Sequence, residues 1–358
     1  MARIRVLIID DSPLARRVLS EALAQDPSIE VVAVASDALF ARDKLARLAV
    51  DVVTLDLEMP RIDGLSFLRA LLAARPLPTI VISAFSPRGG EVALRALELG
   101  AVDVLPKPEG SLDDCGEAFA AELVAKVKVA ARATVHPRRR ARAAGSVATP
   151  APRVASRPPL VGLRAEVRGP IILLGASTGG CAAIPEILAG FPADAPPVVC
   201  VQHIAAGFSA SFAARLDGLG NFRATEARNG DVLERGRVYV APGGSQLTFV
   251  GTVRPVLQVQ PAAPRDVHRP CIDLTFRSAA ALGPRVLAAI LTGMGADGAD
   301  GLKAIRDAGG FTVAQDEASS VIFGMPREAA RRGAAAVVAP LDAIAERLLT
   351  EARRRRQT

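Results

Sequence analysis

The chain has 358 residues, which is enough for two domains with separate hydrophobic cores. Its apolar runs are too short to span a bilayer and its N-terminus leads straight into a strand pattern, so we expect a soluble, cytoplasmic protein without membrane insertion. The four cysteines lie far apart and lack C-x-x-C spacing, which excludes a zinc ribbon and a disulfide scaffold as its framework.

The net charge of +7 is concentrated in two segments. Residues 132–168 contain nine arginines and a single acid, Glu166, and residues 353–356 add four arginines. The first segment is rich in Pro, Ala and Arg without hydrophobic periodicity, which is typical of an extended linker. Neither a folded basic face nor a recognition helix is indicated, so the charge does not predict nucleic-acid binding.

Five short β-branched segments alternate with helical patterns in the first 125 residues. The segments read RVLIIDD, EVVAVAS, DVVTLDL, TIVISAF and AVDVLPK. One of the helical patterns, PLARRVLSEALAQ, places Leu14, Val18 and Leu19 on one face. Repeated β–α units of this length predict a flavodoxin-like (βα)5 domain with a parallel sheet.

Polar residues end four of these strands. Asp10 and Asp11 end the first and Asp56 ends the third, and these two strands are neighbours in a flavodoxin-like sheet. Carboxylates brought together repel unless a divalent cation screens them, and Mg2+ prefers such oxygen ligands. With Ser83 ending the fourth strand and Lys107 ending the fifth, the arrangement suits transient acceptance of a phosphoryl group.

This pattern resembles the receiver domain of two-component response regulators. The resemblance implies that Asp56 is the phosphoacceptor, that Mg2+ lies among Asp10, Asp11 and Asp56, that the Ser83 hydroxyl follows the phosphoryl group, and that Lys107 is its ion-pair partner. The family usually has an aromatic residue two or three positions before the lysine, where this chain has Val104. The resemblance therefore implies phosphorylation without the aromatic part of the family's switch.

A second alternation of strands and helices follows the linker. Strands are predicted at IILLGAS, VVCVQH, RVYVAPGG, VLAAILTG, FTVAQD and AAVVAP, helices around 182–188 and 209–216, and a hairpin near 246–260. We therefore predict a second doubly wound, mainly parallel α/β domain at residues 169–350. The receiver occupies 1–125, the linker 126–168, and a basic tail 351–358.

The first strand of this second domain leads into GASTGG, residues 175–180. G-x-S-x-G is the pattern of a nucleophilic serine, here Ser177, on a tight strand-to-helix turn, and the alternative is a serine that only caps the helix. A dinucleotide site at this turn is disfavoured because Ala176 and Ser177 follow its first glycine, which does not fit G-x-G-x-x-G, and His203 stands where that site needs an acid. An α/β-hydrolase triad of Ser177, Asp231 and His268 is disfavoured because this serine follows the first strand of its domain.

A serine nucleophile needs a base, and the chain has three histidines. His203 ends VVCVQH, the next strand, whereas His268 lies in a predicted loop and is the weaker candidate, and His136 lies in the linker. The base in turn needs an orienting acid. Asp297 and Asp300 both follow VLAAIL in LTGMGADGADG, a spacing unlike that of a calcium loop, and the residues alone do not choose between them.

Six motifs behind the receiver resemble the CheB family, the chemotaxis protein-glutamate methylesterases. In order they are GASTGG, VQHIAAGFSASFAARL, YVAPGG, HRPCID, LTGMGADGADG and AQDEASSVIFGMPREA, and the resemblance covers nearly all of the chain except the linker and tail. It implies Ser177 as nucleophile, His203 as general base and Asp297 as orienting acid. It also implies the backbone N–H of Met294 as an oxyanion donor.

The implied activity is hydrolysis of glutamyl methyl esters on chemoreceptors with release of methanol, and family members also deamidate receptor glutamines. The resemblance further implies a histidine kinase as phosphodonor, a receiver that covers the catalytic mouth until Asp56 is phosphorylated, and an esterase that needs no cofactor. The alternative is a non-catalytic docking module for a receptor or kinase, switched by phosphorylation.

Overall fold

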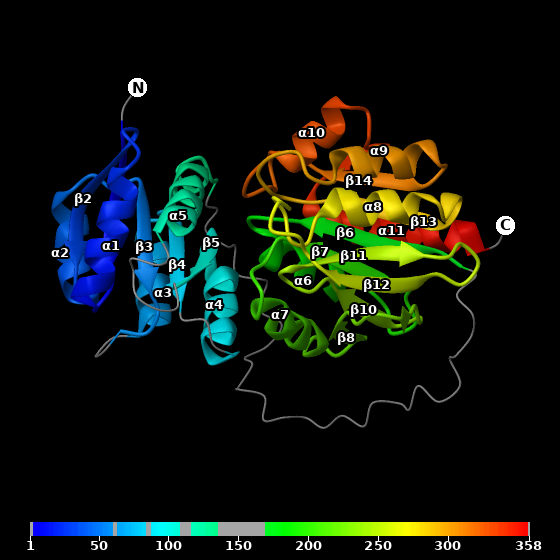
Figure 1. The fold of residues 1–358 in the computed structure, drawn as a ribbon, viewed down its shortest axis with the longest axis horizontal. Coiled ribbons are helices and arrows are strands. Elements are labelled where there is room, and N and C mark those ends of the chain that lie inside the picture. Colours follow the sequence, from blue (N-terminus) through cyan, green and yellow to red (C-terminus); the bar gives the residue numbers. More distant parts are fainter. Residues whose placement is uncertain (1–2, 60–62, 84–86, 108–115, 135–168, 357–358) are drawn as a thin grey trace.

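The computed structural model describes residues 3–59, 63–83, 87–107, 116–134 and 169–356. His136, Cys115 and most of the predicted linker lie outside these residues. The described residues form two α/β units that lie side by side (Figure 1). None of the described helices is long and apolar enough to cross a membrane.

The first unit is a five-stranded parallel sheet in the order β2-β1-β3-β4-β5. The strands are β1 (Ile4–Ile9), β2 (Ile29–Ala35), β3 (Val52–Asp56), β4 (Thr79–Ser83) and β5 (Asp103–Pro106). The helices are α1 (Pro13–Ala24), α2 (Ala38–Arg47), α3 (Gly64–Ala74), α4 (Pro87–Leu99) and α5 (Gly116–Ala130). The predicted flavodoxin-like order is confirmed, and it brings the carboxyl ends of β1 and β3 together.

Short polar side chains fix where the first three helices begin. Ser12, Asp37 and Asp63 each accept a hydrogen bond from a backbone N–H in the first turn of α1, α2 and α3. Such caps satisfy N–H groups that have no partner inside the helix. Ser12 thereby fixes the start of α1 directly after Asp10 and Asp11.

The second unit is built on a seven-stranded parallel sheet in the order β15-β14-β13-β6-β7-β10-β8. Its strands are β6 (Ile171–Ala176), β7 (Val198–Gln202), β8 (Arg223–Glu226), β10 (Arg237–Val240), β13 (Val286–Ile290), β14 (Phe311–Gln315) and β15 (Val337–Ala339). The helices are α6 (Gly180–Ala189), α7 (Phe208–Asp217), α8 (Ile272–Ala280), α9 (Ala299–Asp307), α10 (Met325–Arg331), α11 (Leu341–Arg356) and a 3-10 turn (Gly283–Arg285). The prediction of a second, mainly parallel α/β domain is therefore confirmed.

A small antiparallel sheet accompanies the large one. It consists of β9 (Asp231–Val232), β11 (Ser245–Val250) and β12 (Val256–Pro261), and β11 pairs with β12 as the predicted hairpin. In the large sheet β6, β7 and β13 are buried along their whole length and adjacent to one another. Because parallel strands end at the same edge, the three loops that follow them meet at one rim.

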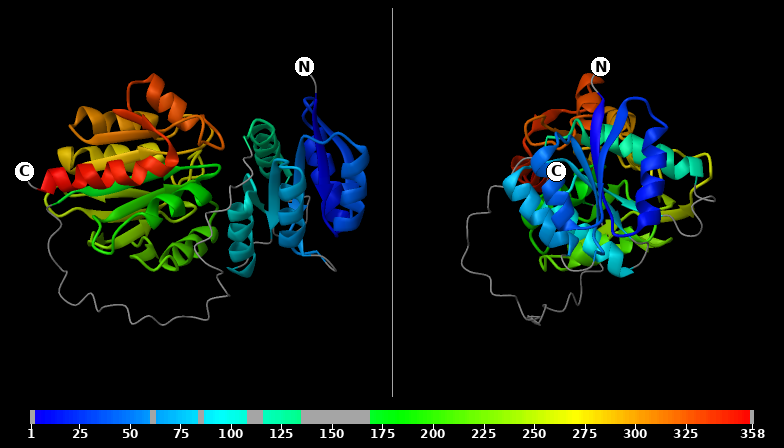
Figure 2. Two further views of the ribbon diagram at one scale, coloured as in Figure 1. Left: turned by 180° about the vertical axis from the view of Figure 1, so that it is seen from behind. Right: turned by 90° about the vertical axis from the view of Figure 1, so that its left-hand side faces the viewer.

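Helices α4 and α5 of the first unit face the second unit (Figure 2). Helix α4 packs against α6 and α7, and Glu98 of α4 forms an ion pair with Arg215 of α7. Beyond α5, the N–H of Thr134 donates to the carbonyl of Val321 at 3.1 Å. One cluster of buried apolar side chains includes members of both units. The receiver is thus seated against the second unit in this structure.

Two predicted boundaries fall inside helices. Helix α5 continues past residue 125 to Ala130, since Val127 is still buried against the receiver sheet. Helix α11 continues past residue 350 to Arg356, and Ala352 is buried. The arginines of the predicted tail therefore form the last turn of α11. The sequence pattern did not predict this last turn, because a run of four arginines interrupts the apolar periodicity of the residues before it.

Candidate active site

Ser177 occupies the turn between β6 and α6. The residue that caps α6 is Gly179, which has a φ of 84°, and no side chain caps this helix. A side chain on that backbone conformation would be strained, which explains the glycine two residues after the serine. The alternative that Ser177 merely caps the helix is therefore wrong, and its hydroxyl is available for chemistry.

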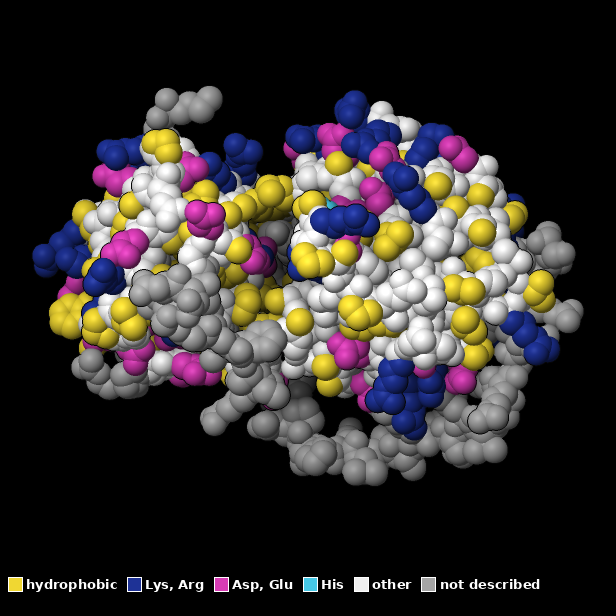
Figure 3. Space-filling model, in the orientation of Figure 1, with side chains coloured by type: hydrophobic (Ala, Val, Ile, Leu, Met, Phe, Trp, Pro, Cys, Tyr) yellow, Lys and Arg dark blue, Asp and Glu magenta, His cyan; other side chains and the backbone are white. Residues whose placement is uncertain are grey.

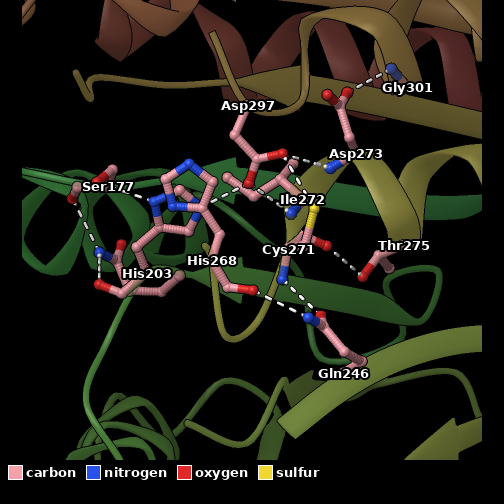
Figure 4. Close-up of polar contacts among 11 residues, drawn as sticks. Ser177, His203, Gln246, His268, Cys271, Ile272, Asp273, Thr275, Asp297 and Gly301 are labelled. Atoms are coloured by element: carbon pink, nitrogen blue, oxygen red, sulfur yellow. Dashed lines mark hydrogen bonds and ion pairs between the residues drawn. The ribbon is translucent and has the colours of Figure 1, made fainter. Parts of the chain in front are cut away.

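The hydroxyl of Ser177 faces the imidazole of His203, and that imidazole faces Asp297 (Figure 4). Ser177 Oγ lies 3.2 Å from His203 Nδ1, and His203 Nε2 lies 2.7 Å from Asp297 Oδ2. The three residues follow β6, β7 and β13, the adjacent central strands. This is the connectivity of a serine nucleophile, its base and an acid that orients the base.

Asp297 binds more than the base. Its carboxylate also accepts the N–H groups of Ile272 at 2.8 Å and Asp273 at 2.9 Å, which belong to the first turn of α8, and the Cys271 thiol lies 3.3 Å away. Burial alone would raise the pKa of Asp297, but the bonds to His203 and to these N–H groups hold it well below its usual value. The carboxylate is therefore ionised and fixed in orientation.

Asp300, the other candidate acid, points elsewhere. It pairs with Arg277 at 3.3 Å and with Arg332, on the surface and away from the imidazole. Its position inside the first turn of α9 directs it toward α8 and α10. The structure thus places Asp297, and not Asp300, beside His203.

The backbone around Ser177 can stabilise negative charge that develops near the serine. Gly293, before Met294, approaches so closely that a Cβ atom there would lie 2.7 Å from Ser177 Cβ, so only glycine fits. This brings the loop that carries the Met294 N–H against the serine. Helices α6, α7 and α9 all begin at this rim after a glycine of positive φ and without a side-chain cap. Their N-terminal ends favour negative charge there.

Two further residues support the site, one that the sequence prediction missed and one that it named only as a weaker candidate. Gln202 is buried, and its Nε2 donates to the carbonyls of Ser177 at 2.8 Å and His203 at 3.0 Å, so it links the turn of the nucleophile to that of the base. His268, predicted only as the weaker candidate base, stacks its ring on that of His203. Two features of the sequence could have indicated these residues. Gln202 directly precedes His203, and a histidine in a loop can fold back to the rim where the base lies.

At the edge of the receiver sheet, Asp10, Asp11 and Asp56 bring carboxylate oxygens within 4.8 Å of one another. Lys107 Nζ lies 2.7 Å from Asp56 Oδ2 and 3.1 Å from Asp10 Oδ2, although Asp10 Oδ2 accepts no well-aligned hydrogen bond. Burial raises the pKa of Asp10 despite the lysine. One lysine leaves two negative charges uncompensated, and this all-oxygen donor set fits Mg2+.

The remaining predicted switch residue, Ser83, is buried at the end of β4 and donates to the carbonyl of Gly89 at 3.2 Å in α4. Its own carbonyl accepts the N–H of Lys107 at 2.7 Å. The acidic edge, the lysine and the start of α4 are therefore connected by direct hydrogen bonds.

A cavity of about 860 Å3 separates the catalytic rim from the receiver, and Figure 3 shows hydrophobic side chains along the gap between the two units. Ser177, His203 and Met294 line one side, and residues of β5 and α5, Val104 among them, line the other. Thr178 Oγ1 donates to Asp103 Oδ2 at 2.9 Å across this gap. The receiver therefore bonds directly to the residue after the nucleophile.

Comparison with known proteins assigns both units to parts of one family. Residues 172–348 match the CheB methylesterase family and residues 6–114 match the response regulator receiver domain. The protein-glutamate methylesterase/protein-glutamine glutaminase 2 of Pseudomonas aeruginosa is 47% identical over 354 residues, which cover 98% of each chain. The protein-glutamate methylesterase/protein-glutamine glutaminase of Bordetella pertussis is 45% identical over 353 residues, 98% of this chain and 97% of its own.

Two solved structures resemble separate parts of the chain. The CheB methylesterase catalytic domain of Thermotoga maritima is 34% identical, with a TM-score of 0.49, over 51% of this chain and 99% of its own. The response regulator domain of Thermotoga maritima CheB is 36% identical, with a TM-score of 0.34, over 37% of this chain and 98% of its own.

The geometry predicts that Asp297→Asn slows labelling of Ser177 by a serine-directed fluorophosphonate by about 10³-fold, because an amide no longer fixes the reactive tautomer of His203. It also lowers the free energy of unfolding by about 2 kcal/mol through loss of charged hydrogen bonds to α8. Because the pKa of Asp297 is depressed in the folded protein, this stabilisation is present above the ordinary carboxyl pKa of 3.8 and is lost as the pH falls through the folded value.

The control is Asp300→Asn, which removes a surface carboxylate from the first turn of the following helix α9 and leaves the labelling rate unchanged. Mass spectrometry measures the labelling, and thermal unfolding at several pH values measures the stability. Equal labelling rates in the two variants would contradict the assignment of Asp297.

Proposed function

From the premise that the chain belongs to the CheB family of chemotaxis methylesterases, we propose how its residues perform and regulate the reaction. The protein is a protein-glutamate methylesterase and protein-glutamine glutaminase of chemotaxis adaptation, controlled by its receiver domain. The observation that carries the mechanism is the chain of contacts from Ser177 through His203 to Asp297.

Acylation begins when Ser177 Oγ attacks the carbonyl carbon of a glutamyl methyl ester. His203 Nδ1 takes the hydroxyl proton, since Nε2 donates its own proton to Asp297 Oδ2. The Met294 N–H and the N-terminal ends of the neighbouring helices stabilise the oxyanion of the tetrahedral intermediate, and each good donor contributes about 10²- to 10³-fold in rate. Collapse expels methoxide, which leaves as methanol with the proton from His203.

Deacylation repeats the sequence with water. His203 removes a proton from water, the resulting hydroxide attacks the Ser177 ester, and Ser177 Oγ leaves with the proton returned by His203. The products are free enzyme and a glutamate carboxylate. With a glutamine substrate the first leaving group is ammonia and the second half is the same. This chemistry requires no cofactor in the catalytic unit.

The receiver controls access to this site. Mg2+ held by Asp10, Asp11 and Asp56 would screen the carboxylates and the incoming phosphoryl group. Asp56 accepts that group from a chemotaxis histidine kinase, and the added charge draws Lys107 and Ser83 toward it. Because Ser83 bonds to α4, and α4 packs on α6 and α7, this rearrangement weakens the seat of the receiver on the catalytic unit.

We place this activity in the cytoplasm, with the cytoplasmic helices of chemoreceptors as substrates. The receiver, which extends through α5, and the catalytic unit, which begins before β6 and extends through α11, are joined by a connecting segment whose length allows them to separate. Ser177 lines the space between the two units, and we propose that undocking of the receiver widens the access of a receptor helix to it.

Replacement of the nucleophile separates catalysis from docking. Ser177→Ala removes the attacking oxygen and is expected to reduce methanol release from methylated receptor membranes by at least about 10³-fold. Binding to the same membranes, measured by co-sedimentation, remains as in the wild type. Methanol release that does not depend on Ser177 would favour the docking module without an esterase.

Replacement of the phosphoacceptor separates the switch from the site. Asp56→Asn keeps the size of the side chain but cannot form an acyl phosphate. We expect no radiolabel from a small phosphodonor, no stimulation of methanol release, and basal activity equal to that of the wild type without donor. Chelation of Mg2+ produces the same two losses in the wild type. Stimulation that persists in Asp56→Asn would remove this residue from the mechanism.

The bond between Thr178 and Asp103 predicts a change in basal activity. Asp103→Ala removes a hydrogen bond that holds the receiver in place, so methanol release without phosphodonor rises about 2- to 10-fold. The phosphorylated rate is unchanged, because undocked protein lacks this bond already. Asp43→Ala, an exposed change on α2 at the far side of the receiver, is the matched control. An equal basal rate in both variants would contradict the role of this bond.

A further inference from the structure

His268 has no place in the sequence of proton transfers, yet its ring lies flat against that of the base (Figure 4). The two ring centroids are 4.4 Å apart and the ring planes differ by 11°. The contacts of His203 with Ser177 and Asp297 lie at the edge of its imidazole, at the two nitrogens. These two contacts hold the nitrogen atoms of the His203 ring. His268 packs against one face of the same ring.

The loop that carries His268 is anchored to a different sheet from the triad. Gln246 of β11 donates from Nε2 to the carbonyl of His268 at 2.9 Å, and its Oε1 accepts the N–H of Cys271 at 2.9 Å. Arg269 donates to the carbonyls of Asp266 at 2.8 Å and Pro264 at 2.6 Å. The position of His268 is therefore set by the protein and does not depend on a substrate.

We infer that His268 is a positioning residue: its ring holds the imidazole of His203 in the plane that reaches both Ser177 and Asp297. The inference rests on the proposed function, in which His203 gains and loses a proton in each half of the reaction. Parallel, offset aromatic rings attract each other, and the face of a neutral ring also attracts a cation. The stack therefore persists when His203 becomes an imidazolium.

The charge state of His268 agrees with this role. Burial and the neighbouring His203 lower the pKa of His268, and Asp297 opposes them with a smaller effect. The ring that faces His203 is thus neutral, so it does not repel the imidazolium. A second charge at this distance would instead have opposed proton transfer from Ser177.

A different role for His268 would be contact with the substrate, because it lines the cavity with Val267 and Met294, which are 88% and 48% exposed. The two roles differ in kinetics. A substrate contact made equally in the ground state and the transition state changes KM, whereas a positioning residue changes kcat. They also differ in what can replace the histidine, since stacking needs only a flat ring.

The test compares His268→Leu with His268→Phe in the full-length, phosphorylated protein, with methanol release from methylated receptor membranes as the readout. Leucine fills space without a ring face, and we expect kcat to fall about 3- to 10-fold with KM unchanged, the effect of losing one stacked pair. Phenylalanine keeps the stack, and its kcat stays within about twofold of the wild type. His203→Ala is the reference for loss of the base.

NMR spectroscopy detects the stacking of the two rings independently of catalysis. The ring protons of His203 carry an upfield ring-current shift in the wild type and His268→Phe, and lose it in His268→Leu. Equal kcat losses in the two variants, an effect on KM alone, or a loss as large as that of His203→Ala would overturn the inference. If the wild type shows the ring-current shift but no Ser177-dependent methanol release, the proposed function fails while the stack stands.

Discussion

The carboxylate of Asp297 connects the catalytic residues to the fold. It is buried, and three kinds of partner stabilise its charge: an imidazole, two backbone N–H groups and a thiol. Removing so concentrated a charge from water is costly unless every lone pair is used. The base, the first turn of α8 and the loop after β13 must therefore adopt their positions together. Catalytic geometry and local stability depend on one set of bonds.

The alternation of strands and helices predicted both sheets, and the rule that parallel strands end at one edge predicted that Ser177 and His203 lie close together. The strand and loop patterns alone did not choose between Asp297 and Asp300, and only the family resemblance favoured Asp297. Both follow the same strand, and what separates them is the N-terminus of α8, which comes from an earlier part of the chain. Likewise, the structure shows that Gly179, and not Ser177, is the N-cap residue of α6.

Sequence patterns could not predict the contacts between the two units. Asp103 lies in a strand and Thr178 in a turn, and nothing in the sequence around either residue indicates its partner. The continuation of α5 and α11 was hidden by the lysines and arginines in their C-terminal turns. The position of His268 depends on Gln246 in a hairpin that packs beside the main sheet. Such relationships arise from packing and not from local propensity.

The space between the two units gives the receiver a share in the walls around the nucleophile. Residues of β5 and α5 line this space on one side, and Ser177, His203 and Met294 line it on the other. Any movement of the receiver therefore changes the shape of the space above the serine. The bonds that join Ser177, His203 and Asp297 lie wholly within the catalytic unit, so none of them crosses the boundary between the units.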